Sequence, residues 1–291
     1  MWGLMQNCSE KNIAMPFFSH REDWLLPSQL SGDARILHLY NSGFDAQFKD
    51  KLLFFAVNAE MLHPFAILVP LAMLDLVCEN NTLHFDATGL AFNDKNGTRL
   101  ILQAAAPVKS SLRPSEINWS AIEENLQTLY GNLKLFGRSS IILDLLFGCA
   151  DAKNSLLTSE MLILSPEPDL KQLLPFVGMG EGLTPSFDDF LSGMLFADRF
   201  LGINRIKIPK NFLCDIAGRT TIQAVQQLKF ACLGLLSMRF ESFLYNFASQ
   251  KIKSSEVVKL LAHGHSSGTE LLCGIWHYLA HIAPPGLLLA I

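Results

Sequence analysis

The chain has 291 residues, of which 49% are hydrophobic and 17% charged, and its formal net charge is −4. This composition is typical of a folded chain with a large core, and it argues against a strongly basic nucleic-acid-binding surface. No run of 18 apolar residues is present, so we expect neither a membrane-spanning helix nor a membrane partner.

The N-terminus and the cysteines indicate a cellular location. The first residues lack the basic start and apolar block of a signal peptide. The six cysteines form no Cys-x-x-Cys pair, which is typical of free thiols in a reducing compartment. We therefore expect a cytoplasmic protein without a disulfide framework.

The first third of the chain predicts β-structure. Short apolar runs bounded by turn residues stand at 34–40, 51–57, 65–69 and 98–104. The pair Asn96-Gly97 indicates a hairpin, because both residues tolerate positive φ. We predict a β-rich N-terminal domain over residues 1–110, built as a small barrel or a sandwich.

Helical spacing of apolar residues begins near Ser115. Predicted helices lie at 115–136, 139–149, 168–176, 187–202, 210–249, 255–262 and 268–282. The run 210–249 is expected to break into two helices near Gly234. Proline, serine and basic residues cluster at 106–116, as in a linker. We predict an α+β chain whose mostly helical domain spans 111–291, with the apolar tail 283–291 docked on the core or on a partner subunit.

The segment 176–194, FVGMGEGLTPSFDDFLSGM, is the least ordinary part of the helical half. Gly178, Gly180 and Gly182 alternate with other residues before Thr184. Glycine is unfavourable in a folded chain unless positive φ or close approach of a ligand requires it. Exposed N–H groups in such a loop can bind an anion, although the spacing matches neither the dinucleotide fingerprint nor the Walker loop. The segment therefore predicts an anion-binding loop.

Two helix starts share one pattern. Ser186 and Ser267 are each predicted to cap a helix, with Asp189 and Glu270 three residues later completing a capping box. Seven residues after each serine stands a glycine, Gly193 or Gly274. A glycine inside a helix costs about 1 kcal/mol relative to alanine, so the shared offset indicates close approach of another backbone. We expect these helices to pack against each other with their N-terminal loops converging.

The two acids beside the loop restrict the ligand. Asp188 and Asp189 would repel a bare phosphate, whereas Mg²⁺ binds one or two carboxylates together with phosphate oxygens. An amide or ammonium donor would also suit them. We predict a small ligand with a phosphate or carboxylate end at the glycine loop, and Mg²⁺ or an N–H group at the two aspartates.

At these residues the chain resembles a bacterial family, one member of which is a subunit of the oxamate carbamoyltransferase of anaerobic allantoin breakdown. The segments that carry the resemblance are GMGEGLTPSFDDFLSG (178–193), TTIQAVQQLKFACLG (220–234) and GHSSGTELLCG (264–274). Phe187 stands where the family usually has glycine, and we expect it to narrow the helix entrance. Glu270 stands where aspartate is commoner. The resemblance covers residues 30–282 and implies a carbamoyl- or carboxylate-handling role within a multi-subunit enzyme.

The motifs and the resemblance together give a set of candidate site residues. Asp188, Asp189 and His265 are predicted to be catalytic, with His265 stabilising charge or transferring a proton during acyl or carbamoyl transfer. The predicted ligand-binding residues are Gly178, Gly180, Gly182, Thr184, Ser186, Ser266, Ser267, Gly268 and Arg219. Partner enzyme subunits or further copies of the chain are expected, and nucleic acid is not.

Other interpretations stay open. His277 and His281 could bind zinc from one helix face, although the His-Glu-x-x-His motif is absent. Ser186, His265 and Asp188 could form a hydrolytic triad, although no Gly-x-Ser-x-Gly elbow occurs. In a further alternative, the glycine loop is only a structural corner and the chain is a non-catalytic scaffold or regulatory subunit.

Overall fold

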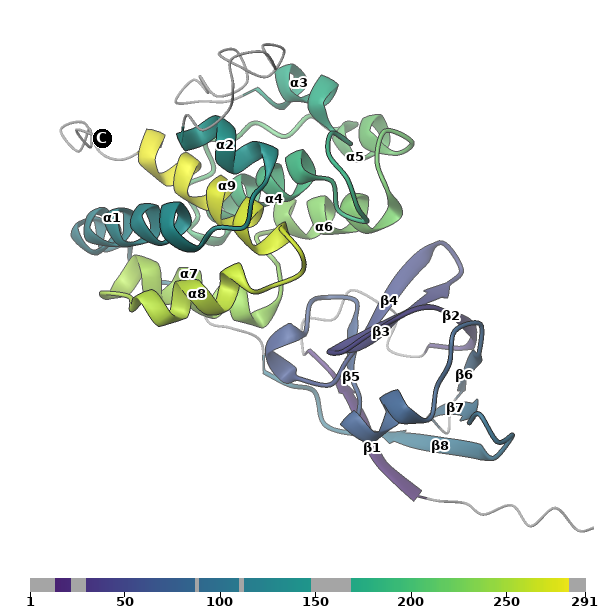
Figure 1. Ribbon diagram of the computed structural model, residues 1–291. Helices are drawn as coiled ribbons and strands as arrows, with labels where there is room; N and C mark the ends of the chain where they lie inside the picture. The colour runs from purple at the N-terminus through teal and green to yellow at the C-terminus, as the bar shows by residue number, and fades with distance from the viewer. Residues whose placement is uncertain (1–13, 22–29, 87–88, 110–112, 148–168, 283–291) are drawn as a thin grey trace, which may run out of the picture. The chain divides into compact units, whose positions relative to one another are not determined.

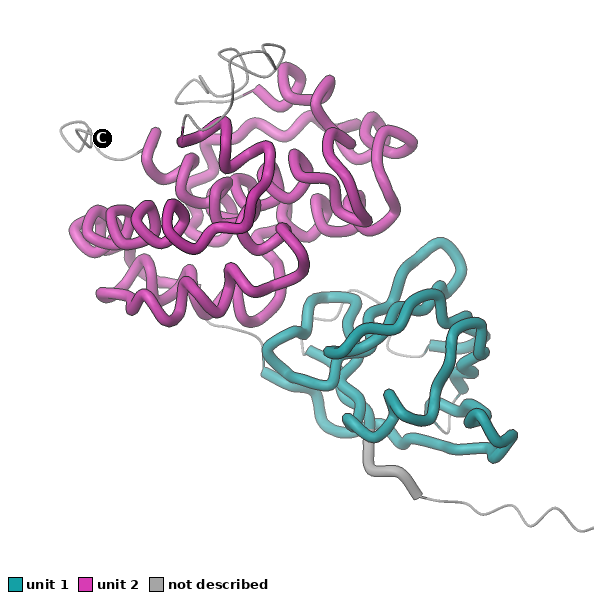
Figure 2. Tube along the Cα trace, viewed as in Figure 1, with its two compact units in different colours: residues 1–110 teal, residues 111–291 magenta. Residues whose placement is uncertain are grey.

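The computed structural model describes residues 14–21, 30–86, 89–109, 113–147 and 169–282. The chain divides into two compact units, Met1–Ser110 and Ser111–Ile291 (Figure 2). Among the described helices, none is long and apolar enough to cross a membrane. The tail 283–291, which we expect to dock on the core or a partner, lies outside the described residues.

The first unit is a closed β-barrel (Figure 1). Its described strands are β1 (Ala14–His20), β2 (Gly32–Tyr40), β3 (Gly43–Phe48), β4 (Lys51–Ala56), β5 (Ala66–Leu68), β6 (Thr82–Asp86), β7 (Gly89–Asn93) and β8 (Arg99–Ala104). Around the barrel they follow the order β1-β5-β4-β3-β2-β6-β7-β8. The β1–β8 and β4–β5 pairs are parallel and the remaining pairs are antiparallel.

Alternation of side chains explains the barrel core. Along β3, Phe44, Ala46 and Phe48 are buried, and the stacked rings of Phe44 and Phe55 lie 4.5 Å apart. Residues on the same face of neighbouring strands pack in this way because the side-chain period of a strand is two. The four apolar runs correspond to β2, β4, β5 and β8, and the hairpin at Asn96-Gly97 implies β7, whereas β1, β3 and β6 match no predicted run.

The predicted hairpin at Asn96-Gly97 is confirmed. The Asp94 N–H donates to the carbonyl of Thr98 between β7 and β8, and Gly97 adopts φ +80°. Asn96 is not among the residues with positive φ, so only the glycine needs its conformational freedom. The α+β class is likewise confirmed, with a barrel as the β-rich part.

The second unit is helical. Its described α-helices are α1 (Trp119–Phe136), α2 (Ile141–Phe147), α3 (Leu170–Leu173), α4 (Ser186–Phe200), α5 (Phe212–Ile216), α6 (Ile222–Cys232), α7 (Met238–Ser249), α8 (Ser254–Leu261) and α9 (Ser267–Ile282). Helix α4 is buried on nearly all sides and contacts α9, α6 and α2 (Figure 1). A helix buried on nearly all sides lies in the core of its unit, and α4 buries three acids there, Asp188, Asp189 and Asp198, together with its apolar side chains.

One predicted helical run differs from the structure. The stretch 210–249 forms three helices rather than two. The expected break at Gly234 is present, with φ +71°. A second break separates α5 from α6, where Gly218 adopts φ +91° and Ala217 bridges Thr220. This turn brings Thr220 beside the candidate site described next.

Candidate functional site

Helices α4 and α9 pack against each other through two glycines. A Cβ at Gly193 would lie 2.1 Å from the carbonyl oxygen of Leu271, and one at Gly274 would lie 2.0 Å from that of Phe190. Each glycine therefore allows the backbone of the other helix to approach. Counted from Ser186 and Ser267, the glycine seven residues into each helix faces the residue that stands four residues into the other helix. The helices run parallel, because Thr184 meets Ser267 at one end of the pair and Asp198 meets Tyr278 at the other, and their N-terminal loops therefore converge.

The predicted serine caps are wrong. Ser186 and Ser267 are the first residues inside their helices rather than N-caps. The carbonyl of Pro185 accepts the first-turn N–H groups of α4, and that of Ser266 does the same for α9. The serine hydroxyls face the opposite helix instead, because the glycine contacts hold the two helix starts side by side.

Hydroxyl and carboxyl groups cross between the two helix starts. Asp189 Oδ2 accepts a hydrogen bond from the Thr184 hydroxyl at 2.9 Å, and Thr184 and Ser267 hydroxyl oxygens lie 2.9 Å apart. Ser267 of α9 also hydrogen-bonds Asp189 of α4, while Ser186 of α4 lies near Glu270 of α9. The repeated sequence pattern thus becomes a reciprocal polar contact.

Asp189 is fully buried, and its second oxygen accepts from the Gln227 amide of α6 at 2.5 Å. Burial raises the pKa of Asp189 from 3.8 to about 7, and the nearby Glu270 charge adds to this rise against the effect of the hydrogen bonds. Burial likewise raises the pKa of Glu270, although Ser186, Ser266, Ser140 and Asp189 oppose the rise. Near neutral pH Asp189 is therefore still protonated in part of the folded molecules.

Glu270 retains an unused acceptor. Its side chain is 1% exposed, and Oε2 accepts a bond of 3.3 Å from the Ser266 hydroxyl. Among the described residues, Oε1 is buried without a hydrogen-bond partner, although Ser186 and Ser140 lie near enough to affect the pKa of Glu270. A buried polar atom without a partner is rare and costs free energy, so it marks a place where a ligand donor or water would be stabilised.

Asp188 joins the glycine loop to the helical core. One of its oxygens accepts from the Gly178 N–H at 2.9 Å, and the other accepts from the Thr220 hydroxyl. Burial raises the pKa of its carboxyl, and these two hydrogen bonds oppose the rise. Both oxygens thus bind groups of the protein itself, and the side chain is fully buried.

Replacing Asp188 with asparagine is expected to destabilise the free protein by about 2 kcal/mol, because an amide nitrogen would meet one of two donors. Chemical denaturation measures this loss. Thr220→Val removes the same contact from the other side and is expected to cost a similar amount. Normal stability of both variants would show that the link between the loop and the core contributes nothing.

The three loop glycines have positive φ, as their spacing predicts: +87° at Gly178, +115° at Gly180 and +91° at Gly182. A Cβ at Gly178 would collide with the Arg219 carbonyl, and one at Gly180 would collide with the backbone of Ser186. A Cβ at Gly182 would meet nothing within 4 Å. The first two glycines are therefore required by the packing of the chain itself, and only the third borders open space.

The loop also exposes backbone donors. Residues 180–183 are exposed, and their N–H groups have no hydrogen-bond partner within the described residues. Such successive N–H groups beside a helix start are suited to bind an anion.

The family model described as oxamate carbamoyltransferase subunit AllH matches residues 176–279. The resemblance read from the motifs is thereby confirmed over this part of the chain. No solved structure matches the chain. The matched residues contain the glycine loop, α4, α6 and most of α9, so they coincide with the two helix starts and their polar contacts.

Phe187 does not narrow the entrance. Its ring is 1% exposed and packs against Phe176 and Phe190, with centroids 5.6 and 6.0 Å away. As the second residue of α4 it points toward the core, because the helix turns it away from the side that carries Ser186 and Asp189. The side chain at this position therefore leaves the surface of the glycine loop open.

His265 lies in the exposed turn before α9. Its carbonyl accepts from the Arg138 guanidinium at 2.7 Å, as does that of Gly264 at 2.8 Å. The Arg138 backbone N–H donates to the Thr269 hydroxyl at 3.0 Å, so this arginine holds the turn against α9. His265 thus stands at the exposed rim of the site, whereas Asp188 and Asp189 lie beneath it.

Two predicted ligand-binding residues serve packing in the free protein. The Arg219 guanidinium donates to the Asp215 carbonyl at 3.1 Å, and only its backbone meets Gly178. Gly268 is buried, and a Cβ there would lie 2.1 Å from the Leu260 carbonyl. Neither residue makes a described contact with the buried side chains of Asp189 and Glu270.

Sequence reasoning missed four polar residues of this site: Arg138, Ser140, Thr220 and Gln227. Thr220 and Gln227 lie in the stretch 220–234, so the family resemblance was a usable signal for them. Arg138 and Ser140 lie outside the matched segment, and their distance in sequence from α9 gave no local signal.

The predicted metal chemistry gains no support from the donor set. Within the described residues, no group of three or more His, Cys, Asp or Glu side chains is placed to hold a metal ion. Both oxygens of Asp188 and both of Asp189 accept hydrogen bonds from the protein. Mg²⁺ at these aspartates would have to displace those donors or accept the oxygens as shared ligands, and magnesium at this site stays a prediction.

The two other candidate sites are also placed by the structure. His277 and His281 face each other with ring centroids 4.2 Å apart, and His277 is buried with its pKa lowered to about 3, chiefly by burial. Ser186 and Asp188 do not form the hydrogen bonds of a hydrolytic triad with His265 among the described contacts.

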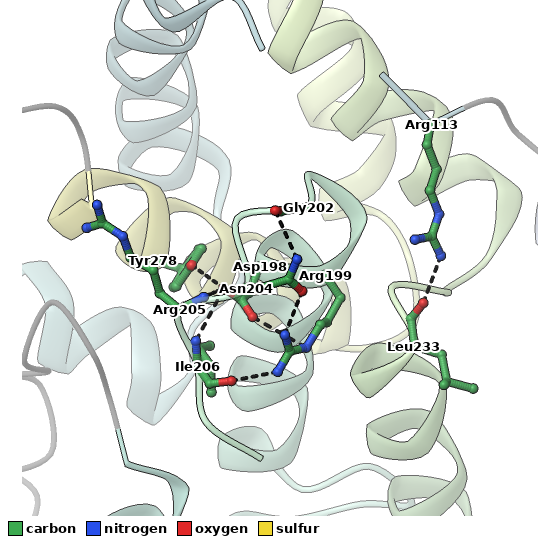
Figure 3. A network of polar contacts seen from close by, with 9 residues as sticks. All are labelled: Arg113, Asp198, Arg199, Gly202, Asn204, Arg205, Ile206, Leu233 and Tyr278. Atoms are coloured by element: carbon green, nitrogen blue, oxygen red, sulfur yellow. Dashed lines mark hydrogen bonds and ion pairs between the residues drawn. The ribbon is translucent and has the colours of Figure 1, made fainter. Parts of the chain in front are cut away.

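The opposite ends of α4 and α9 are fastened by a second network (Figure 3). The Tyr278 hydroxyl of α9 donates to Asp198 of α4, and the Arg205 N–H donates to the same oxygen at 2.7 Å. The Arg199 guanidinium donates to the Ile206 carbonyl at 2.6 Å. Fixing both ends of the helix pair holds the N-terminal side chains in one arrangement, as a binding site requires.

Proposed function

We propose that this chain is a subunit of a carbamoyltransferase-type enzyme and that its helical unit binds a small ligand at the paired starts of α4 and α9. One observation carries the proposal: the family match over residues 176–279 coincides with the residues that build this site. A ligand with a phosphate or carboxylate end would bind the exposed N–H groups of the glycine loop, beside the Thr184 and Ser186 hydroxyls.

The buried acids would recognise the other end of the ligand. Within the described residues Glu270 Oε1 has no hydrogen-bond partner, although Ser186 and Ser140 lie near the carboxyl, and it lies with Asp189 where α4 and α9 meet. An amide N–H would satisfy it at little electrostatic cost, because the raised pKa of Asp189 keeps the pair from carrying two full charges. Ser266 and Ser267 would hold oxygens, and His265 at the rim would stabilise charge or transfer a proton.

Partner subunits belong to this proposal, since the matched family is named as a subunit. Two large apolar side chains beside the glycine loop are exposed, Leu183 at 43% and Ile222 at 54%. They adjoin each other, because the Thr221 hydroxyl donates to the Leu183 carbonyl. Exposed apolar groups at the rim of a site are suited to contact another subunit.

A thermal-shift screen of carbamoyl phosphate, nucleotides and small carboxylates, with and without Mg²⁺, tests the proposal. At a concentration of 100 Kd, a binding ligand stabilises the folded state by about 2.7 kcal/mol. We expect Gly182→Ala to remove this response with a cost near 1 kcal/mol to the free protein, because the methyl group enters open space at the loop.

Asp215 is an exposed acid on α5, and the variant Asp215→Asn controls for the loss of one negative charge away from the site. Asp189→Asn should weaken the response and Asp215→Asn should leave it unchanged. A chain whose melting temperature responds to none of these compounds would favour the scaffold alternative, as would equal responses in Gly182→Ala and the unmodified protein.

A further inference from the structure

The outer face of the barrel carries a row of side chains unrelated to the helical site. His38 of β2 stands opposite Asp45 of β3, and Asp45 stands opposite Phe54 of β4. Directly paired residues of neighbouring strands point to the same face of a sheet. The neighbouring pair Phe44 and Phe55 is fully buried, so it marks the inner face and places the row on the outer one.

Four rings line this row in succession. The ring centroids of His38 and Tyr40 are 6.4 Å apart, those of Tyr40 and Phe54 are 6.4 Å apart, and those of Phe54 and His63 are 6.0 Å apart. Gly43, which pairs with Tyr40, makes room for them. A Cβ at Gly43 would lie 2.1 Å from the Phe55 carbonyl oxygen and 2.8 Å from the Phe54 ring, so any other residue would disturb both the strand pairing and that ring.

Asp45 lies within the row without a strong cationic partner. Asp45 is 7% exposed, and its Oδ2 accepts a hydrogen bond from the Tyr40 hydroxyl at 2.7 Å. The closest basic group in the described chain is His38 Nδ1 at 4.0 Å, a nitrogen that has no hydrogen-bond partner. Oδ1 accepts no hydrogen bond from any described residue. Burial raises the pKa of Asp45, because the charged carboxylate is unfavourable where water is excluded. A bound cation would stabilise the charged carboxylate.

We propose that Asp45 and the rings of Tyr40, Phe54 and His63 form a binding site for an alkylammonium or guanidinium cation. Ring faces attract such cations, and a partly buried carboxylate supplies the opposite charge. Tyr40 is 37% exposed and the His38 side chain 45% exposed, so these two rings are accessible, whereas the Asp45 side chain behind them is 10% exposed. The cation is either a free small molecule or a basic side chain of another protein chain.

Titration of the full chain with n-butylammonium chloride, and separately with the peptide Gly-Lys-Gly, whose side chain carries the same butylammonium group, tests this site by NMR chemical-shift changes. We expect saturable binding that Asp45→Asn weakens at least tenfold. Asp33→Asn is the matched control, because this exposed barrel aspartate pairs with His84 at 2.6 Å and lies outside the row. Binding of both probes identifies a free-cation site, whereas binding of the peptide alone identifies a basic side chain as the occupant.

Two further variants keep the test informative if Asp45→Asn folds poorly. Tyr40→Phe removes the hydroxyl but keeps the ring, so binding should persist, while Tyr40→Ala should lose it. A purely structural role for the Tyr40–Asp45 bond predicts that both variants lose stability and that no probe binds. Absence of saturation with either probe, or equal affinity in the Asp45→Asn and Asp33→Asn variants, would overturn the proposal.

Discussion

Replacing Gly274 with alanine is expected to lower the free energy of unfolding by about 3 kcal/mol or more. The added methyl group would lie 2.0 Å from the Phe190 carbonyl oxygen, and backbone cannot move aside as a flexible side chain can. In a unit of this size such a loss corresponds to a melting temperature lower by about 6–12 °C. Gly193→Ala should behave alike, since its methyl group would lie 2.1 Å from the Leu271 carbonyl.

Gly131→Ala is the matched control for helix propensity. Gly131 lies inside α1, and a Cβ there would meet nothing within 4 Å. Alanine at this position should stabilise the protein by about 1 kcal/mol. Differential scanning calorimetry of the three variants separates the two effects, and stable Gly193→Ala and Gly274→Ala proteins would contradict the close parallel packing of α4 and α9.

Stability is expected to fall as the pH rises from about 4 to about 7. The folded-state pKa of Asp189 is raised from 3.8 to about 7, so the folded protein holds a proton that the unfolded chain has released. The unfolded state therefore binds fewer protons in this window, and the free energy of unfolding decreases by on the order of 4 kcal/mol across it. Above the folded pKa the contribution of Asp189 no longer changes with pH.

Urea denaturation at several pH values measures this slope in the native and variant proteins. Asp189→Asn should flatten the profile between pH 4 and 7. Glu270→Gln should shift the upper end of the window downward, because the Glu270 charge raises the pKa of Asp189. Glu181→Gln, an exposed loop residue, controls for the loss of one carboxylate. Parallel profiles for Asp189→Asn and the native chain would refute the buried proton.

The β-rich half was predictable in class but not in full. Strands β2, β4, β5 and β8 each contain a short run of mostly apolar residues, whereas β3 contains Asp45 and Gln47 on its outer side. A strand that shows one face to the core and a polar row to the outside is recognised only when its partners are known. The aromatic row around Asp45 is invisible in sequence for the same reason.

The helical half shows where local patterns were read correctly and where they were not. The shared glycine offset of the two helices predicted their contact, and Gly193 and Gly274 confirm it. The serine caps were wrong because a capping pattern competes with tertiary contacts, and here Ser267 faces Thr184 across the interface.

The sequence by itself determined the features that depend on a few adjacent residues: the positive φ of the loop glycines, the break at Gly234 and most of the helices. Only the tertiary structure decided the partners of the acids, because Thr220 and Gln227 lie more than 30 residues from Asp188 and Asp189. Burial and its effect on a pKa arise when such distant segments exclude water together, and no local pattern records that event.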